Sequence, residues 1–184
     1  IAVQNILSGL PSKCLLHIGN SMAVRYVNAF QGLLKGDQQV FVNRGTSGID
    51  GCLSTALGHA VNSEEDVFCV LGDLSFQYDK NALWNRYLPS NLKIIVLNNN
   101  GGVIFQMIKG PKEQTVFEDF FRTKQLNKAG KLASEFGLEY LEVSSYEQLN
   151  YSLKKLTSVS KASILEIFTD SEQSEKDYKA LLNL

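Results

Sequence analysis

The sequence predicts an α/β fold: a doubly wound, mainly parallel sheet of about six strands with helices on both faces. Two observations lead to this prediction. Short apolar runs such as Val67–Leu71 and Ile94–Leu97 lack the alternation of a half-exposed strand, as expected for parallel strands that are buried on both faces. Segments with helical periodicity separate these runs, and that order is typical of right-handed β-α-β crossovers.

Three strand–helix pairs are expected in the first half of the chain, after the end of a helix at residues 3–10. The strands are short apolar runs at 13–18, 39–42 and 67–71. The helices follow at 21–34, where apolar residues recur near helical spacing, at 49–61, which is rich in small residues, and at 75–88, which ends before a proline.

The second half continues this alternation after one long interruption. A strand at 93–97 precedes an irregular segment at 101–124, which has one short helix around 116–121. The sequence does not assign a role to residues 111–124. A helix at 127–136 ends at Gly137, which suits a left-handed C-cap. The remaining elements are strands at 139–143 and 163–168, a helix between them at 146–158, and a terminal helix from residue 172.

Composition indicates an ordinary globular domain. The 184 residues are 44% hydrophobic and 20% charged, enough for one domain with a substantial core, and no repeat or low-complexity linker divides them. A formal net charge of -1 gives no electrostatic reason to bind nucleic acid. No apolar stretch reaches the roughly 20 residues that an integral membrane segment needs. Cys14, Cys52 and Cys69 lack metal-ligand spacing and fit buried thiols in a reducing cytoplasm, the expected location.

Polar residues follow two of the predicted strands directly. Gly72-Asp73-Leu74-Ser75 comes after the strand at 67–71, and Asn98 to Gly102 comes after the next. Ligands bind at the carboxyl ends of strands in open α/β sheets. A carboxylate, a side-chain amide and a glycine backbone there offer the oxygen atoms that suit Mg²⁺ carrying a phosphate. Alternatively, Asp73 and Ser75 only cap the helix that follows.

Two further loops at the same predicted edge carry arginines. Ser21 and Arg25 are four residues apart and share a helix face just after Gly19-Asn20. Arg44 lies in the glycine-rich turn at 43–51, whose backbone can approach a ligand closely. Arginine binds carboxylate or phosphate bidentately, so the pair suggests an anionic substrate, although each alone also fits a solvated surface residue.

Apolar residues follow the second polar motif. They form either a packed helical turn or a wall over a reacting carbon: Ile104, Phe105 and Ile108. The two histidines, His17 and His59, fit satisfied or partly buried residues better than catalytic bases.

Together these loops resemble one family, the 2-succinyl-5-enolpyruvyl-6-hydroxy-3-cyclohexene-1-carboxylate synthases (MenD) of menaquinone biosynthesis. The resemblance runs from Lys13 to Ile108 and continues beyond Pro111 only as a compatible pattern of helices and strands. The wider group of thiamine diphosphate enzymes has Gly-Asp-Gly and, some two dozen residues later, Asn-Asn. Leu74 replaces the second glycine here, as it does in the MenD family.

The resemblance implies a transferase that depends on thiamine diphosphate and Mg²⁺ or Mn²⁺, decarboxylates 2-oxoglutarate and adds the succinyl unit to isochorismate. It implies that Asp73, Asn99 and Gly101 bind the metal, the last through its carbonyl, and that Ile49 holds the cofactor bent. Ile49, Arg25 and Arg44 would be the catalytic residues. The implied cofactor contacts are Asn20, Ser47, Gly48, Ile49, Gly72, Asp73, Leu74, Ser75, Asn99 and Gly101. The implied substrate contacts are Ser21, Arg25, Arg44, Ile104, Phe105 and Ile108.

Residues 1–184 are therefore expected to be the diphosphate-binding domain alone, a piece of a longer chain, because the sequence starts at Ile1 inside a helix. The resemblance implies a pyrimidine-binding domain on a partner subunit that supplies a catalytic glutamate, in a homodimer or homotetramer. The isolated chain is expected to be inactive. Two alternatives stay open: the equivalent domain of an acetolactate synthase-like or 2-oxoacid decarboxylase-like enzyme, and a non-catalytic, flavodoxin-like nucleotide-binding module.

Overall fold

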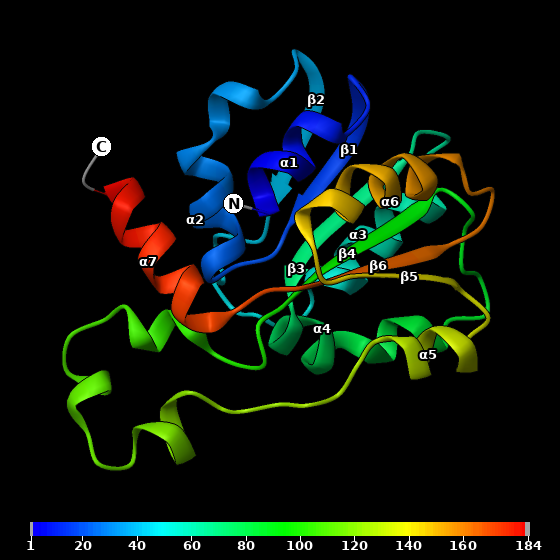
Figure 1. Ribbon diagram of the computed structural model, residues 1–184. Helices are drawn as coiled ribbons and strands as arrows, with labels where there is room; N and C mark the ends of the chain where they lie inside the picture. The colour runs from blue at the N-terminus through cyan, green and yellow to red at the C-terminus, as the bar shows by residue number, and fades with distance from the viewer. Residues whose placement is uncertain (1, 183–184) are drawn as a thin grey trace.

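Six strands form one fully parallel sheet in the computed structural model, which describes residues 2–182 (Figure 1). Their order across the sheet is β2-β1-β3-β4-β6-β5. The strands are β1 Lys13–Ile18, β2 Asp37–Val42, β3 Val67–Gly72, β4 Leu92–Asn98, β5 Glu139–Val143 and β6 Ser163–Phe168. The predicted doubly wound α/β fold is confirmed.

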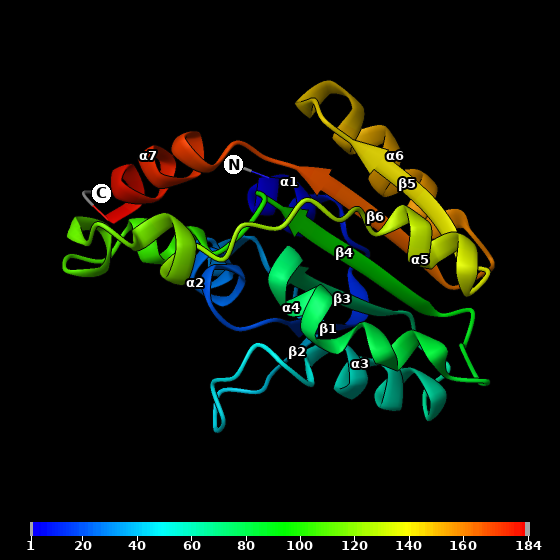
Figure 2. The ribbon, with the colours of Figure 1, turned by 90° about the horizontal axis from the view of Figure 1, so that it is seen from below.

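Helices cover both faces of this sheet, as Figure 2 shows. One face carries α1 Ala2–Gly9, α2 Met22–Ala29, α6 Tyr146–Ser158 and α7 Ser171–Leu182. The other carries α3 Cys52–Val61, α4 Asp73–Asp79 and α5 Gly130–Glu135. Short 3₁₀ segments are η1 Gln31–Leu33, η2 Lys80–Trp84, η3 Val103–Gln106 and η4 Pro111–Glu113, and η5 Phe117–Phe121 is a π-helical turn. No helix within residues 2–182 combines the length and the apolar character needed to cross a membrane.

The two hydrophobic cores lie on opposite faces of the sheet. In β3, Phe68 and Val70 pack into the core beneath α1, α2 and α6, whereas Cys69 and Leu71 pack into the core beneath α3, α4 and α5. Both sets are fully buried. Burial of alternate residues on both faces explains why this strand is continuously apolar in sequence.

Several helix boundaries differ from those predicted. The helix expected at 21–34 ends at Ala29 and is followed by the separate 3₁₀ turn η1. The helix expected at 49–61 begins only at Cys52, because Gly51 precedes it in a left-handed conformation with φ 72°. The helix expected at 75–88 begins earlier, at Asp73, and passes into the 3₁₀ turn η2 at Lys80.

In the C-terminal half, the helix expected at 127–136 is shorter, from Gly130 to Glu135. Its predicted C-cap is confirmed, since Gly137 has φ 71°. The strands at 13–18, 139–143 and 163–168 and the helix at 146–158 have the predicted bounds.

The chain reverses its winding direction between β1 and β3. The α2 crossover leaves β1 on one face towards β2, whereas α4 leaves β3 on the other face towards β4. The loops after these neighbouring strands diverge, and such a point is where open α/β sheets leave a crevice for a ligand. Gly19 follows β1 directly and lies close against β3: a Cβ atom there would lie 2.9 Å from the Cβ of Leu71. The two loops therefore start side by side.

Candidate functional site

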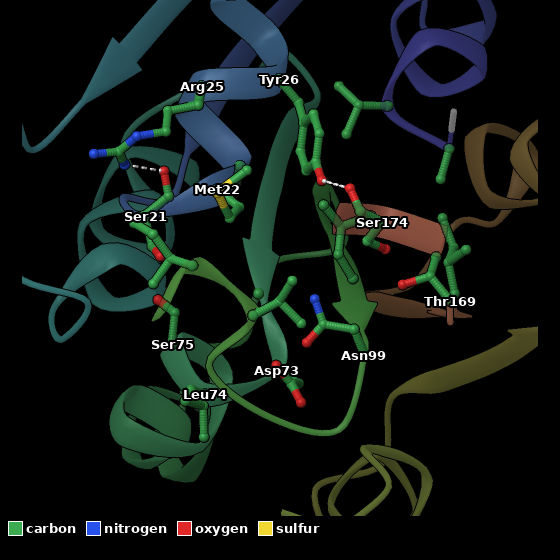
Figure 3. Close-up of a pocket in the computed structure, with 18 of the residues that line it drawn as sticks. Ser21, Met22, Arg25, Tyr26, Asp73, Leu74, Ser75, Asn99, Thr169 and Ser174 are labelled. Atoms are coloured by element: carbon green, nitrogen blue, oxygen red, sulfur yellow. Dashed lines mark hydrogen bonds between the residues drawn. The ribbon is translucent and has the colours of Figure 1, made fainter. Parts of the chain in front are cut away.

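A cavity of about 720 Å³ opens at the carboxyl ends of the strands. The loops after β1, β2, β3 and β4 form one part of its wall, and α7 contributes to another (Figure 3). All the residues predicted to contact cofactor, metal or substrate line this cavity except Gly48 and Ile108. The topology thus brings the four separate motifs into one site.

Asp73 is a buried carboxylate without a counter-ion. Its Oδ2 accepts hydrogen bonds from the Gly101 N–H at 2.8 Å and from Gln125 Nε2 at 2.7 Å. Within residues 2–182, no basic side chain forms an ion pair with it. Burial raises the pKa of the Asp73 carboxyl to about 6, although the hydrogen bonds from Gln125 and the backbone oppose this rise. A cation would stabilise the ionised form here.

The side-chain oxygen of the neighbouring Asn99 has no hydrogen-bond partner among residues 2–182. This atom, Oδ1, is buried. Asn100 follows with φ 61° and Gly101 with φ 139°, so the backbone turns back and its Gly101 N–H reaches Asp73. Figure 3 shows the Asp73 and Asn99 side chains at the same side of the cavity. Buried polar atoms normally have a partner, so the Asn99 oxygen is open to a ligand.

These donors suit a hard divalent cation that brings some of its own ligands. Across residues 2–182 there is no cluster of three or more His, Cys, Asp or Glu side chains able to hold a metal ion. Mg²⁺ is typically bound by one or two carboxylates together with phosphate oxygens and water. The site therefore fits Mg²⁺ that is bound together with a phosphate: it offers one carboxylate, one unpaired amide oxygen and the Gly101 backbone. These are too few ligands for a cation that only protein atoms coordinate.

Ser75 connects two of the loops at the site. Its hydroxyl donates a 2.5 Å hydrogen bond to the carbonyl of Ile49, which lies in the turn after β2. Asn20 holds the same turn, because its Nδ2 donates to the carbonyls of Asn43 at 3.1 Å and Gly48 at 2.7 Å. The position of Ile49 in the cavity wall is therefore set by side chains from the ends of β1 and β3.

Strained backbone occurs at the rim of the cavity. Ser21 has φ 67° and Ser47 has φ 55°, and both line the cavity. Non-glycine residues seldom adopt positive φ, and such residues are concentrated at functional sites.

The two arginines lie at this rim with their guanidinium groups partly engaged. Arg44 Nη1 donates to Asn20 Oδ1 at 3.0 Å, and Arg25 Nη1 donates to the Ser21 carbonyl at 2.7 Å. Each guanidinium has five N–H donors, so most remain available to an anion. Both side chains are exposed and line the same cavity. The same cavity is therefore lined by the Asp73 carboxylate and, at its rim, by two arginine guanidinium groups.

The apolar residues after the second motif divide between two environments. Ile104 and Phe105 line the cavity, and the Phe105 ring contacts that of Phe121 with a centroid distance of 6.3 Å. Ile108 is 45% exposed and lies outside the cavity wall.

The segment that the sequence left unassigned returns to the site. The Gly102 N–H donates to the Arg122 carbonyl at 2.6 Å, and a Cβ atom on Gly101 would lie 2.8 Å from the same oxygen. Three residues further on, Gln125 bonds to Asp73. Sequence reasoning missed Gln125, because it belongs to no motif and to no periodic segment.

The histidines lie away from this site. His17 Nε2 and His59 Nδ1 are 2.9 Å apart, and the His17 ring stacks on Phe41. Burial, with a smaller contribution from His59, lowers the pKa of His17 to about 4. The expectation of satisfied, buried histidines is confirmed for His17, and the three cysteines are free and buried, as predicted.

Comparison with known proteins identifies the family. Residues 19–167 match the profile of the thiamine pyrophosphate enzyme, C-terminal TPP binding domain. Proteins named 2-succinyl-5-enolpyruvyl-6-hydroxy-3-cyclohexene-1-carboxylate synthase are similar over almost the whole chain. The one from Cytophaga hutchinsonii is 46% identical over 97% of this chain and 32% of its own length. Those from Christiangramia forsetii and Desulfotalea psychrophila are 45% and 42% identical, over 91% and 92% of this chain and 29% and 31% of their own lengths.

This chain thus spans about a third of the length of the relatives that it matches. The residues that match the family profile include all the predicted site residues. The chain belongs to the family of C-terminal thiamine pyrophosphate-binding domains of thiamine pyrophosphate enzymes.

Proposed function

We propose that this chain is the diphosphate-binding domain of a 2-succinyl-5-enolpyruvyl-6-hydroxy-3-cyclohexene-1-carboxylate synthase. The enzyme would decarboxylate 2-oxoglutarate and transfer the succinyl unit to isochorismate in the cytoplasm. The observation that carries the metal site is the pairing of the Asp73 carboxylate, which lacks a counter-ion, with the unpartnered Oδ1 of Asn99. The names of the relatives support the choice of reaction.

In this proposal, Asp73 and Asn99 bind Mg²⁺ or Mn²⁺ through their side chains and Gly101 binds it through its carbonyl. Ile49, held by Ser75, shapes the cavity wall against the cofactor. Thiamine diphosphate, when bound, supplies the electron sink for decarboxylation and acyl transfer. The remaining proposed cofactor contacts are Asn20, Ser47, Gly48, Gly72, Leu74 and Ser75.

The residues at the rim would bind and enclose the substrates. Arg25 and Arg44 would hold substrate carboxylates, because both residues line the cavity and each guanidinium keeps free N–H donors, and Ser21 would add a hydroxyl. Ile104 and Phe105 would provide the apolar side that excludes water. Ile108 would contribute to that side only at the outer edge, given its exposure.

The remaining parts of the proposal concern the rest of the enzyme. A pyrimidine-binding domain from a partner subunit would close the cavity and supply the catalytic glutamate, in a homodimer or homotetramer. The chain by itself would then bind cofactor weakly and show no turnover.

Product analysis tests the proposed reaction. The full-length enzyme, with thiamine diphosphate and Mg²⁺, should release CO₂ from 2-oxoglutarate and consume isochorismate in equal amounts. Turnover should stop when EDTA removes the metal. Arg44→Lys should raise the KM for a carboxylate substrate, because lysine lacks the bidentate donor pair. Preferential consumption of pyruvate would instead indicate an acetolactate synthase-like or decarboxylase-like enzyme.

Calorimetry tests the binding function separately. Titration of thiamine diphosphate into the full-length enzyme should release heat only when Mg²⁺ or Mn²⁺ is present. Binding that is absent with and without metal would contradict the proposal and favour the flavodoxin-like module.

A further inference from the structure

We propose that Gln125 is a positioning residue for the divalent cation, acting through Asp73. This inference rests on the proposed function, because it presumes that Asp73 binds a metal. Gln125 comes from the end of the long segment between β4 and α5, and it is buried, with 9% of its surface exposed.

The orientation of the Gln125 amide is determined by its neighbours. Its Oε1 accepts a hydrogen bond from the Asn127 N–H at 2.8 Å, so its NH₂ group must point the other way. That group donates to Asp73 Oδ2 at 2.7 Å and to Asn98 Oδ1 at 3.2 Å. One side chain therefore bridges the residue that follows β3 and the last residue of β4.

This bridge restrains the metal-binding carboxylate. Asp73 Oδ2 receives two donors, Gln125 Nε2 and the Gly101 N–H, from residues on either side of the long segment. A carboxylate held through one oxygen by two donors cannot rotate freely about its terminal bond, so its other oxygen, Oδ1, keeps a constant direction. We infer that Gln125 directs Oδ1 towards the cation that Asn99 shares.

The bridge is itself anchored in the sheet. Asn98 Nδ2 donates to Glu166 Oε1 at 2.7 Å, and Glu166 Oε2 accepts from the Ala129 N–H at 3.0 Å. The segment from Gln125 to Ala129 is therefore held at both ends by buried polar groups of β4 and β6. Such a fully bonded network fixes side-chain orientation more strongly than an isolated hydrogen bond does. Partners of metal ligands typically change metal affinity by about 10–100-fold when they are replaced.

The test measures Mg²⁺ affinity directly. In the full-length enzyme at saturating thiamine diphosphate, Gln125→Met should raise the Kd for Mg²⁺ by about 10–100-fold, because methionine keeps the size of glutamine and loses its donors. Excess Mg²⁺ should restore cofactor binding. The matched control is Gln114→Met, since Gln114 is an exposed glutamine of the same segment that donates only to the nearby Gly110 carbonyl. It should leave the Kd unchanged.

A second variant covers the case in which Gln125→Met does not fold. Gln125→Asn keeps an amide but is one methylene too short to reach Asp73, so the same rise in the Mg²⁺ Kd is expected. The unfolding temperature in EDTA separates the roles: a merely structural glutamine would lower that temperature and leave the Kd for Mg²⁺ unchanged. An unchanged Kd, or an equal rise in the Gln114→Met control, would overturn the inference. If the unmodified enzyme shows no Mg²⁺-dependent binding of thiamine diphosphate, the proposed function fails as well.

Discussion

Replacing Asp73 by asparagine should stabilise the metal-free protein at neutral pH and abolish its metal-dependent cofactor binding. The Asp73 carboxyl is buried and unpaired, and its pKa rises from 3.8 to about 6. The folded protein therefore holds this proton more tightly than the unfolded chain does, so ionisation reduces stability as pH rises from 3.8 through 6. A difference of this size corresponds to at most about 3 kcal/mol above pH 6.

Asparagine removes that charge and keeps the two hydrogen bonds that Oδ2 accepts from Gly101 and Gln125. Its side-chain oxygen can accept from the Gly101 N–H and from Gln125, as Asp73 Oδ2 does. Asp73→Asn should therefore raise the free energy of unfolding by up to about 3 kcal/mol at pH 8 and by less than about 1 kcal/mol at pH 4.

Urea unfolding at both pH values, with and without Mg²⁺ and thiamine diphosphate, measures this difference. The ligands should stabilise the unmodified protein and leave the variant unaffected. Titration of other groups is common to both proteins and cancels in the comparison. A variant that is less stable at pH 8, or a gain that does not depend on pH, would refute this account of Asp73.

Three other predictions concern the buried polar groups that support the fold. The pKa of His17 is lowered to about 4, so as pH falls the unfolded chain binds the His17 proton before the folded protein does. The free energy of unfolding should therefore be highest above pH 6.5 and fall by up to about 3 kcal/mol towards pH 4. His17→Gln should flatten this part of the pH profile measured by urea unfolding. An unchanged slope would contradict this. Lys93→Met should lower the free energy of unfolding by about 2 kcal/mol, because the buried Nζ donates hydrogen bonds to three backbone carbonyls. A variant of unchanged stability would contradict this, since removal of the buried charge would then offset the loss of these hydrogen bonds. Glu166→Gln should lower the free energy of unfolding by about 2 kcal/mol, measured by thermal or urea unfolding, because the new amide NH₂ would face a donor such as the Ala129 N–H. Glu142→Gln, at an exposed position, is the control and should leave the stability nearly unchanged.

The strands were predictable because a strand that is buried on both faces is a continuous run of apolar residues in the sequence. Every residue of β3 from Val67 to Leu71 is buried, so no polar residue interrupts the run. Helix starts were less predictable, because they depend on backbone conformation: Gly51 turns left-handed and delays α3 to Cys52. Glycine can adopt both conformations, so the Asp50-Gly51 pair indicates a turn without determining at which residue the helix begins.

The candidate site was predictable where it depends on topology. Asp73 and Asn99 follow adjacent parallel strands, and the ends of such strands necessarily meet at one edge. Gln125 was not predictable, because it reaches Asp73 from a long segment without periodicity, and only the folded path of that segment sets its place. The assignment of Ser75 as a cofactor contact stays a proposal, and its hydroxyl donates to the Ile49 carbonyl, a partner that the sequence did not indicate.

The Ser75–Ile49 hydrogen bond has a consequence for how a ligand would be received. It joins the start of α4 to the turn after β2. The conformational entropy of ordering that turn is then lost during folding, and little of it remains to be lost on association. A pre-organised turn favours rapid capture without a slow rearrangement. Ser75→Ala should therefore slow the association of the ligand.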